Sequence, residues 1–600
     1  MRIYIYLSFA SIINFIFNYR KEIIYQKRVS SNILDSITKI NSNDKKYLNK
    51  YRILEEKIEK KKLCDDIIIL FTNDVHCGIM ENIGYDGLSL YKKELKEKYK
   101  TVLTVDTGDA IQGGAIGILS RGMDIVNIMN KIHYDVTILG NHEFDYGISQ
   151  IKYISEKLNN SYICSNCCFR KNKTSIFPPY KIIKINSNTS IGFIGVDTPQ
   201  TFSKTFLHSC IDKDGKPVYD FLTHNNGKEL YDTLQKYINE VQTKGANYVI
   251  LLSHLGNNGD SLKRYTTDTL VSNLEGVDLV LDGHSHLSYN ILSKDKKGKL
   301  IPIIQGGSKF SHIGKITIKN NGKILSELIS EIPEPINKTK ALYIKRKKKM
   351  RWVDSEMKKI LEDIIFQYSE NLNRIIGFSN FDMLINNSRG DECPLCNLIA
   401  DGIRDVGNAD CSIINAGNVR NNLMQGDITY NDILDVLPFA DKIVIKEIKG
   451  IDLLDALEFG VRNLPNRSQR FPHVSGIVFD VNTKIESTIE VDDNEMFVGV
   501  KGQRRVSDVM INGKKLSLNK KYKIALSDFV SSGGDGYSMF SKYKVAFNTF
   551  IEDNEAFITF IQNKFNGTIP DFYRVKQGRI VIDSNEKFDI FYHTLYKIYE

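Results

Sequence analysis

Short apolar runs and amphipathic stretches alternate along the chain from residue 67 onward. The runs have the length and composition of buried strands: IIILF (67–71), TVLTV (101–105), DVTIL (135–139), IGFIGV (191–196), YVILLS (248–253) and DLVLD (278–282). Between them, residues 88–99, 123–132 and 227–243 space their apolar side chains as helices do. Strands that alternate with helices predict a layered α/β domain.

A break in this pattern separates two domains. Pro333 and Pro335 are followed by the basic stretch KRKKKMR (345–351) and a helical pattern to about residue 370. The basic run has no interleaved aromatic residues for base stacking, so it indicates a solvated helix face. We therefore expect an N-terminal extension over 1–65, a first α/β domain over 66–335, a helical linker over 336–374, a second α/β domain over 375–582 and a tail over 583–600.

The extension begins with an apolar run over residues 3–17, which basic residues flank on both sides. This run matches the apolar core of a signal peptide and is shorter than the ~20 residues that span a bilayer. No small-x-small cleavage site follows, and residues 19–64 are polar, as in a tether. The segment predicts an exported protein: secreted, periplasmic or at the cell surface. A cleaved signal, a retained anchor that associates with the membrane, and an amphipathic start without a targeting role all stay open.

Composition excludes several classes of protein. The 600 residues are 42% apolar and 26% charged, which fits a soluble globular chain and not a disordered one. Most of the net charge of +9 comes from residues 1–62, which hold 14 Lys and Arg against 6 Asp and Glu; the rest of the chain holds 67 against 66. The folded part therefore has no excess positive charge that would favour nucleic acid. The 9 cysteines are an odd number, so at least one has no partner within the chain.

Polar clusters follow five of the predicted strands directly. They are TNDVHCG (72–78), DTGDAIQGG (106–114), GNHEFDYG (140–147), SHLG (253–256) and DGHSH (282–286). In open α/β sheets, ligands bind beyond the carboxyl ends of the strands. We therefore expect the five clusters to converge on one crevice.

The residue types in these clusters suit a pair of metal ions. Two divalent cations about 3.5–4 Å apart require a bridging carboxylate with imidazole and oxygen ligands, and they activate a water for attack on phosphorus. Such ligands suit Zn²⁺, Mn²⁺, Fe²⁺ or Co²⁺. Isolated histidines such as His133 and His312 are better explained as structural, but five of the 11 histidines lie in the clusters. The candidate ligands are Asp74, His76, Asp109, Asn141, His254, His284 and His286.

In this order, the motifs TNDVHCG, GDAIQGG, GNHEFDYG, SHLG and GHSH resemble those of the calcineurin-like metallophosphoesterases. More narrowly, they resemble the bifunctional UDP-sugar hydrolase/5′-nucleotidase family. NAGNVRNNLMQGDITYNDILDVLPF (415–439) and SDFVSSGGDGY (527–537) resemble the nucleotide-binding C-terminal domain of that family. The resemblance covers about residues 66–582. It implies a four-layered calcineurin-like sandwich and a second α/β nucleotide-binding domain, joined by a helical linker.

The resemblance also implies roles for the strand-end residues. One metal ion would be held by Asp74, His76, Asp109 and His286. The second would be held by Asp109, Asn141, His254 and His284. Asp109 would thus be the bridging carboxylate, and a hydroxide that bridges the two metals would be the nucleophile.

Two further residues of the same motifs would assist the reaction. His142 would donate a hydrogen bond to the phosphoryl oxygens, and Asp145 would orient its imidazole and keep it cationic near the phosphate. No protein nucleophile is needed in this scheme, so Cys77 has no catalytic role.

The second domain would bind the substrate. By the family pattern, Arg389 and Arg420 would bind the phosphate, and Phe439 and Phe529 would stack on the two faces of the base. Asp535 would accept hydrogen bonds from the ribose. Asn415 and Asn418 would line the adjoining loop. Base stacking on an aromatic side chain is worth about 1–3 kcal/mol and tolerates any base.

Three departures from the family pattern bear on this site. The usual Gly-Gly-Gly is Ala416-Gly417-Asn418 here, and the usual Asn-Leu-Gly-Asn-Leu begins with Pro394 and has a cysteine at its centre. Cys393 and Cys396 form a C-x-x-C, and Cys164, Cys167 and Cys168 lie close together. Neither group has the context of a redox or zinc motif, so we expect incidental thiols.

The sequence therefore predicts an exported di-metal phosphohydrolase that releases phosphate from nucleoside 5′-monophosphates. A UDP-sugar pyrophosphatase, a 2′,3′-cyclic phosphodiesterase, a non-nucleotide phosphomonoesterase and an inactive surface nucleotide-binding protein stay open as alternatives. The expected partner is a small nucleotide substrate, with no nucleic acid. Metal identity, base preference and oligomeric state are not predicted.

Overall fold

The computed structural model describes residues 63–204, 218–257, 262–335, 341–346 and 349–583. The N-terminal apolar run and residues 584–600 of the tail lie outside these residues. The chain divides into two compact units, Met1–Cys64 and Asp65–Glu600, and both α/β domains belong to the second unit. Within the described ranges, no helix combines the length and apolar character needed to cross a membrane.

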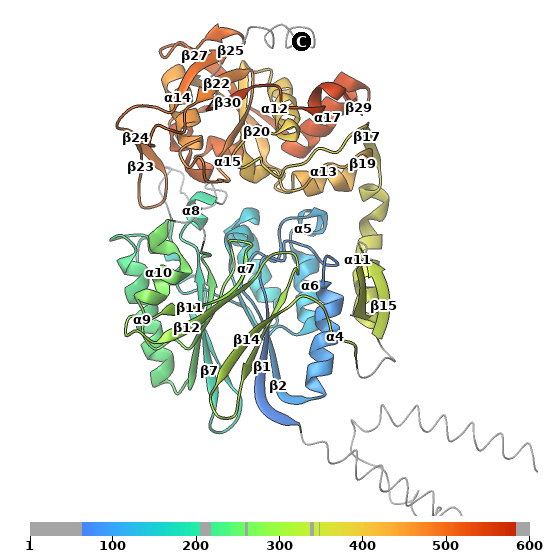
Figure 1. Cartoon of the computed structure of the whole chain (residues 1–600), viewed down its shortest axis with the longest axis vertical. Helices are drawn as coiled ribbons and strands as arrows, with labels where there is room; N and C mark the ends of the chain where they lie inside the picture. The colour runs from blue at the N-terminus through green and yellow to red at the C-terminus, as the bar shows by residue number, and fades with distance from the viewer. Residues whose placement is uncertain (1–62, 205–217, 258–261, 336–340, 347–348, 584–600) are drawn as a thin grey trace, which may run out of the picture. The chain divides into compact units, whose positions relative to one another are not determined.

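Two six-stranded sheets form the centre of the first domain (Figure 1). The first sheet has the strand order β14 (Ile324–Ile329), β13 (Ile313–Ile318), β1 (Cys64–Thr72), β2 (Tyr99–Asp106), β3 (Val136–Ile138) and β4 (Tyr162–Ile163). The second has the order β11 (Ser288–Lys294), β12 (Leu300–Gly306), β10 (Leu279–Leu281), β9 (Tyr248–His254), β7 (Ser190–Asp197) and β6 (Tyr180–Lys184).

The two sheets pack face to face because the side chains of each strand alternate between two cores. In β1, Ile67, Ile69 and Phe71 belong to the core shared by both sheets, while Ile68 and Leu70 belong to the core under the helices. The helices of that outer core are α4 (Gly84–Lys96), α6 (Met123–Ile132) and α7 (Ile148–Lys157). On the other sheet, α9 (Lys228–Thr243) and α10 (Thr267–Ser272) cover the outer face.

This helix–sheet–sheet–helix arrangement confirms the four-layered sandwich implied by the sequence. The six apolar runs lie in β1, β2, β3, β7, β9 and β10, and the three helical stretches correspond to α4, α6 and α9. Fully buried strands read as nearly continuous apolar runs, which is why the sequence revealed them.

The packing between the sheets tolerates no side chain at Gly314, which pairs with Phe71 across β13 and β1. A Cβ added at Gly314 would lie 1.6 Å from Phe71 Cε1. We expect Gly314→Ala to lower the stability of the first domain by about 1–3 kcal/mol or more, as overpacked cores do. The check is the thermal unfolding midpoint of the full chain. Gly499→Ala is the control, because no atom lies within 4 Å of the position that its Cβ would take; an equal midpoint for both variants would contradict the prediction.

The segment between the domains is not helical throughout, in contrast to the sequence expectation. Strands β15 (Ala341–Arg346) and β16 (Lys349–Asp354) form a hairpin before helix α11 (Ser355–Leu372). Tyr343 and Trp352 pair across the two strands, with ring centroids 4.8 Å apart, and such aromatic pairs stabilise hairpins. The Asp354 side chain then caps α11 by accepting a hydrogen bond from Glu356 N (3.1 Å).

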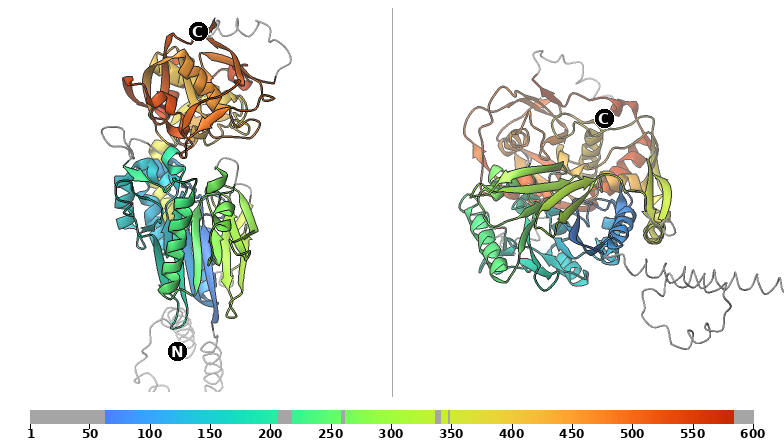
Figure 2. Two further views of the ribbon diagram at one scale, coloured as in Figure 1. Left: turned by 90° about the vertical axis from the view of Figure 1, so that its left-hand side faces the viewer. Right: turned by 60° about the horizontal axis from the view of Figure 1, so that its bottom comes forward.

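Among the described residues, four sheets belong to the second domain, which runs from yellow to red in Figure 2; the smallest pairs β23 (Ile489–Val491) with β24 (Phe497–Val500). The five-stranded sheet has the order β21 (Pro472–Ser475), β18 (Cys411–Asn415), β27 (Lys521–Ser527), β20 (Lys442–Lys449) and β28 (Val545–Glu552). The four-stranded sheet has the order β26 (Lys514–Lys515), β25 (Val506–Ile511), β22 (Ile477–Val481) and β30 (Ile580–Ile582). The three-stranded sheet has the order β19 (Gly426–Thr429), β17 (Ile375–Ser379) and β29 (Thr568–Ile569).

Helices pack on these sheets through two apolar cores. One core contains α12 (Pro394–Gly407) and α17 (Asp553–Phe565), and the other contains α14 (Gly450–Gly460). The short helix α13 (Tyr430–Val436) ends just before Phe439, and the short helix α15 (Asp528–Ser531) contains Phe529. The second domain is therefore α/β as well, and its short connections present the candidate substrate residues.

Candidate functional site

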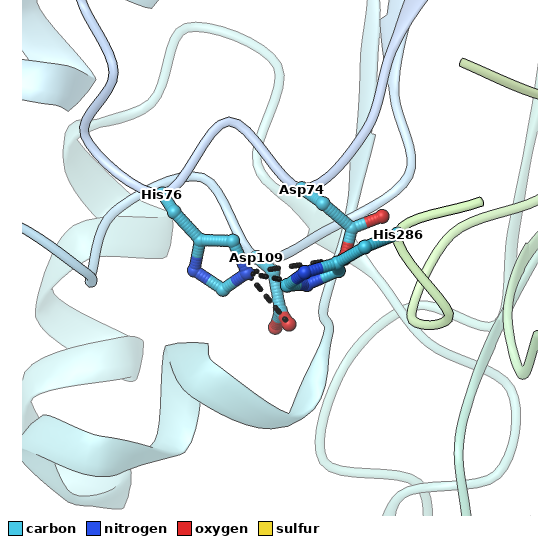
Figure 3. Close-up of side chains that lie close together, drawn as sticks. All are labelled: Asp74, His76, Asp109 and His286. Atoms are coloured by element: carbon cyan, nitrogen blue, oxygen red, sulfur yellow. Dashed lines mark hydrogen bonds and ion pairs between the residues drawn. The ribbon is translucent and has the colours of Figure 1, made fainter. Parts of the chain in front are cut away.

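Loops after the strands of both sheets bring the candidate metal ligands together. Asp74, His76, Asp109 and His286 each place one ligand atom within 4.8 Å of the others (Figure 3). Asp109, His254 and His284 form a second group by the same measure. Asp109 belongs to both groups, which is the position that a bridging carboxylate requires.

Carboxylate oxygens and imidazole nitrogens face one another in this cluster. Asp109 Oδ2 lies 3.1 Å from His254 Nε2 and 3.7 Å from His76 Nε2. Asp74 Oδ1 lies 3.4 Å from His286 Nε2 and 3.9 Å from His254 Nε2. His76 Nε2 and His286 Nε2 are 3.0 Å apart. This donor set of oxygen and nitrogen atoms suits transition-metal cations.

Two buried atoms at this site, His254 Nε2 and Asn141 Oδ1, make no hydrogen bond in the described part of the chain, although His254 Nε2 forms a 3.1 Å ion-pair contact with Asp109 Oδ2. Buried polar atoms nearly always have partners, and both of these belong to predicted ligands. Backbone carbonyls hold the opposite ring nitrogens, since His254 Nδ1 lies 2.6 Å from Thr107 O and His76 Nδ1 lies 2.9 Å from Gln112 O. These contacts place the proton on Nδ1 and leave Nε2 for a metal. The residues present therefore fit divalent metal ions.

The backbone is left-handed at five of the candidate ligands. Their φ values are 48° at Asp74, 45° at His76, 56° at Asp109, 78° at His284 and 57° at His286. Non-glycine residues in this region cost about 1–3 kcal/mol each and cluster at functional sites. Contacts between the loops hold the conformation: Asp74 N donates to Gly108 O (3.0 Å), and His76 N donates to Asp109 O (2.9 Å).

Burial and close charges determine the protonation of the cluster. Burial lowers the pKa of His76 and His284 well below the usual histidine value, which favours the neutral imidazole that ligates metals. Burial alone would raise the pKa of Asp109, but the neighbouring His254 lowers it well below its usual value. Although burial opposes it, Asp109 and Asp74 raise the pKa of His254 well above its usual value. His254 thus holds a proton beside these two carboxylates, and a bound metal ion would displace that proton.

Glu143 supports the cluster, and sequence reasoning missed it. Its buried carboxylate accepts hydrogen bonds from the backbone nitrogens of Gly140 (2.6 Å), Asp109 (2.8 Å) and Ala110 (2.9 Å). Burial raises the pKa of Glu143 to about 7. Glu143 therefore ties the loop after β2 to the loop after β3 and holds Asp109 in place. Its position inside the GNHEFDYG cluster is the sequence signal that could have identified it.

His142 and Asp145 lie on one short 3₁₀ helix, Asn141–Tyr146, next to the metal ligands. His142 Nδ1 is 2.7 Å from Asp145 Oδ2, and Arg420 donates to His142 Nε2 at 2.8 Å. A guanidinium only donates, so Nε2 accepts in this contact, and Nδ1 is the nitrogen that faces the Asp145 carboxylate. The cationic ring near a phosphate that the resemblance implied stays a prediction.

A pocket beside His142 gathers most of the predicted substrate residues. Its lining consists of His142, Asp145, Lys204, Asn415, Gly417, Asn418, Arg420, Phe439, Asp441, Gln469, Phe529 and Asp535. Sequence reasoning missed Lys204, Asp441 and Gln469, which lie outside the recognised motifs or have no assigned role within them. The pocket holds about 50 Å³ of free space, whereas ligand pockets typically offer about 300–1,000 Å³. This free space is therefore smaller than that of a typical ligand pocket.

Two aromatic rings and two asparagines line this pocket. The Phe439 ring centroid is 5.4 Å from that of His142 and 5.0 Å from the Arg420 guanidinium carbon. The Phe529 ring lies against Gly534, where a Cβ would come within 2.5 Å of the ring. Asn415 Nδ2 donates to Asp535 Oδ2 (2.6 Å). Asn418 Nδ2 donates to Asp553 Oδ2 (2.8 Å), so the departure from glycine at this position gains a hydrogen-bond partner.

Arg389 does not line the same pocket. It borders a larger cavity of about 890 Å³, which also contacts His76 and His286. Arg420 borders both cavities and so lies between the metal ligands and the aromatic pocket. Burial, together with the charge of Arg389, lowers the pKa of Arg420 to about 10, which leaves it cationic at neutral pH.

The cysteine groups form no disulfide among the described residues. Cys393 and Cys396 lie at the start of α12, where Pro394 is the first helical residue. Cys164, Cys167 and Cys168 are buried elsewhere, in the first domain. Neither group belongs to a cluster of metal-ligating side chains within the described ranges.

Two family models match the chain. Calcineurin-like phosphoesterase matches residues 67–288, and 5′-nucleotidase, C-terminal domain, matches residues 371–542. The trifunctional nucleotide phosphoesterase protein YfkN of Bacillus subtilis (strain 168) is 25% identical over 575 residues, which are 88% of this chain and 36% of that protein. This chain thus spans about a third of the length of that relative. A snake venom 5′-nucleotidase of Gloydius brevicauda is 26% identical over 523 residues, which are 79% of this chain and 82% of that protein.

Solved structures show the same fold. The 5′-nucleotidase precursor from Thermus thermophilus matches 87% of this chain and 100% of that chain, with a TM-score of 0.69 and 22% identity. A putative 5′-nucleotidase from Staphylococcus aureus matches 86% of this chain and 100% of that chain, with a TM-score of 0.62 and 20% identity. The calcineurin-like fold, together with the shared Asp and His cluster, implies divalent metals. With both domain models matched in order around this cluster, the chain belongs to the family that joins a calcineurin-like phosphoesterase domain to a 5′-nucleotidase C-terminal domain.

Proposed function

We propose that the protein is a di-metal phosphohydrolase that releases phosphate from nucleoside 5′-monophosphates. One observation carries the proposal: a single pocket is lined by His142, which adjoins the metal ligands, and by Phe439, Phe529 and Asp535, which suit a nucleoside. The residues proposed for phosphate chemistry and those proposed for nucleoside recognition thus border the same pocket. The names of the relatives, among them several 5′-nucleotidases, support the same substrate class.

The metal ligands would hold the two ions in the shared arrangement around Asp109. One ion would be bound by Asp74, His76, Asp109 and His286, and the other by Asp109, Asn141, His254 and His284. When bound, divalent cations stabilise charge on the phosphate and lower the pKa of a water that attacks it. His, Asp and Asn ligands suit Zn²⁺, Mn²⁺, Fe²⁺ or Co²⁺.

His142 and Arg420 would stabilise the phosphoryl group as its charge builds. The two side chains line the same pocket, and Arg420 donates to His142 Nε2. A phosphate bound between them would receive the Arg420 hydrogen bond and one from His142 after Nε2 gains a proton. Asp145 would keep the opposite nitrogen protonated and stabilise the resulting cation. Arg389 would grip the phosphate from the side of the larger cavity.

The second domain would bind the leaving nucleoside. Phe439 and Phe529 would stack on the two faces of the base, which gives affinity without strict base selection. Asp535 would accept hydrogen bonds from the ribose. Asn415 fixes its carboxylate through the 2.6 Å hydrogen bond to Oδ2, and Asn418 would line the adjoining loop.

Export would place this enzyme where it meets external nucleotides. The apolar run at residues 3–17 with its basic flanks supports export. Relatives named as a snake venom 5′-nucleotidase and as a cell wall protein of Listeria monocytogenes support it further. Membrane association through the same segment is part of the proposal.

Phosphate release from a panel of substrates tests the function. The full chain would be assayed with AMP, UDP-glucose, 2′,3′-cyclic AMP and p-nitrophenyl phosphate, each with and without EDTA. We expect AMP to have the highest kcat/KM and EDTA to abolish turnover, because the candidate ligands supply no protein nucleophile. Activity should return when a divalent cation is added in excess.

The other outcomes discriminate the alternatives. Preference for UDP-glucose or for the cyclic nucleotide would replace the monoesterase assignment. Preference for p-nitrophenyl phosphate would indicate a phosphomonoesterase whose substrate is not a nucleotide. Metal binding without turnover of any substrate would indicate a nucleotide-binding protein.

A further inference from the structure

A buried lysine of the first domain lines the pocket beside His142 that holds Phe439 and Phe529. Lys204 is the last residue of the short helix α8 (Thr201–Lys204) and is 7% exposed. It lines the pocket together with Phe439, Phe529 and Asp535, all of which come from the second domain. The proposed function gives Lys204 no role, although its side chain lines the proposed substrate pocket.

The ammonium group faces one oxygen of the candidate ribose ligand. Lys204 Nζ donates to Gln469 Oε1 at 2.9 Å and lies 3.6 Å from Asp535 Oδ1. The latter distance exceeds a direct hydrogen bond. The other carboxylate oxygen, Asp535 Oδ2, is the one that accepts from Asn415. Oδ1 is therefore the oxygen that Asp535 presents toward the lysine.

The aspartate of this pair carries a negative charge. Burial alone would raise the pKa of Asp535, but Lys204 and Arg470 lower it, so the carboxylate is ionised. Arg470 also donates from Nε to the backbone oxygen of Asp535 at 2.9 Å. An ionised carboxylate only accepts hydrogen bonds and an ammonium only donates them. The pair thus offers one donor and one acceptor across a short gap.

The helix that carries Lys204 is anchored at both the metal site and the second domain. Gln200 Oε1 lies 3.0 Å from Nε2 of the candidate ligand His284, and Gln200 Nε2 donates to Glu495 Oε1 at 2.8 Å. Glu495 in turn forms a buried ion pair with Arg470. The position of Lys204 is thereby coupled to the metal ligands and to the residue that holds Asp535.

A hydroxyl is the group that matches this pair, because it can accept and donate at once. We propose that Lys204 and Asp535 together bind a ribose hydroxyl, which accepts from Lys204 Nζ and donates to Asp535 Oδ1, and that this site selects ribonucleotides over deoxyribonucleotides. The inference rests on the proposed function, since it takes a nucleotide as the substrate. A sugar that lacks the hydroxyl would lose the hydrogen bonds with both charged groups, which is how sites built for a hydroxyl reject its absence.

The test compares AMP with 2′-deoxyAMP and 3′-deoxyAMP. We expect the wild-type chain to prefer AMP over at least one deoxy analogue by about 10- to 100-fold in kcat/KM, the range for a hydrogen bond to a charged group. In Lys204→Met this ratio should fall to within about 3-fold, because AMP loses its advantage, and Lys204→Arg should keep part of it. Lys228→Met is the matched control, since that lysine is exposed on the first domain and pairs only with Asp232 among the described ion pairs.

Each other result decides against the proposal. A ratio in Lys204→Met equal to the wild-type ratio would overturn it, as would a wild-type chain that cleaves all three nucleotides equally. A wild-type chain that hydrolyses p-nitrophenyl phosphate and not AMP would overturn the proposed function itself. Metal content and circular dichroism verify that the variants fold. If Lys204→Met fails that check, Lys204→Gln decides by the same ratio, because glutamine can still bond to Gln469 without the charge.

Discussion

Replacement of Asp109 by Asn is expected to abolish phosphate release from AMP, with a loss of at least ~10³-fold in kcat/KM. Asp109 is the residue shared by both groups of candidate ligands, and its Oδ2 faces the His254 and His76 ring nitrogens. Asparagine has the same shape and keeps an acceptor for His142 N, which donates to Asp109 Oδ1 at 2.8 Å. It lacks the negative charge that two cations require. The measurements are steady-state turnover and metal content per chain, and we expect the metal content to fall with the activity.

The control for this variant is Asp220→Asn. Asp220 is also a buried aspartate of the first domain, and it contacts a lysine and a histidine, Lys173 and His224. It lies outside the proposed catalytic machinery, so we expect Asp220→Asn to keep turnover even if stability falls. Near-wild-type activity in Asp109→Asn would contradict the di-metal assignment. An equal loss of activity in both variants would show that removal of any buried carboxylate inactivates the enzyme, and the result would then not support a metal-binding role for Asp109.

Removal of the His142 imidazole is expected to lower kcat by about 10²–10⁴-fold while the metal ions stay bound. His142 contacts both Asp145 and Arg420. It belongs to neither group of candidate metal ligands. His142→Ala therefore separates charge stabilisation from metal binding. Asp145→Asn should cause a smaller loss, because the imidazole stays in place with a weaker partner. The measurements are kcat with AMP and the metal content of each variant.

His133→Asn is the control for loss of a histidine. His133 is exposed after α6 and has a φ of 61°, which asparagine tolerates better than alanine does. We expect His133→Asn to leave kcat unchanged. Loss of metal together with activity in His142→Ala would mean that His142 is a ligand, contrary to the role proposed for it. A kcat within a few-fold of wild type would remove it from the reaction.

Local pattern predicted much of the first domain because its central strands are buried on both faces. IIILF and YVILLS, for example, are nearly uniform apolar runs, and they form β1 and β9. The hairpin of β15 and β16 was missed for the opposite reason. Its second strand begins in a basic run, and its stability depends on the pairing of Tyr343 with Trp352 across the turn. Such a cross-strand contact has no periodic signal in one segment.

The sequence by itself determined the family and the chemistry of the candidate site. His, Asp and Asn can ligate metals, and here they follow predicted strands directly, so Asp74, Asp109 and His254 stood out by type and position. The bridging position of Asp109 came from the resemblance to a family, and the structure places it in both ligand groups.

The tertiary structure decided which other residues reach the site. Lys204 and Gln469 lie outside the recognised motifs, and Glu143 lies inside one without an assigned role; each contacts a segment that is distant in the chain. Lys204 and Gln469 are separated by 265 positions and yet lie 2.9 Å apart. The motifs predicted the same phosphate-binding role for Arg389 and Arg420. In the structure, Arg420 borders both cavities, whereas Arg389 borders only the larger one of these two. The residue type alone shows which side chains can bind a metal ion. The selectivity of a pocket depends on the distances between loops, and only the folded chain sets those distances.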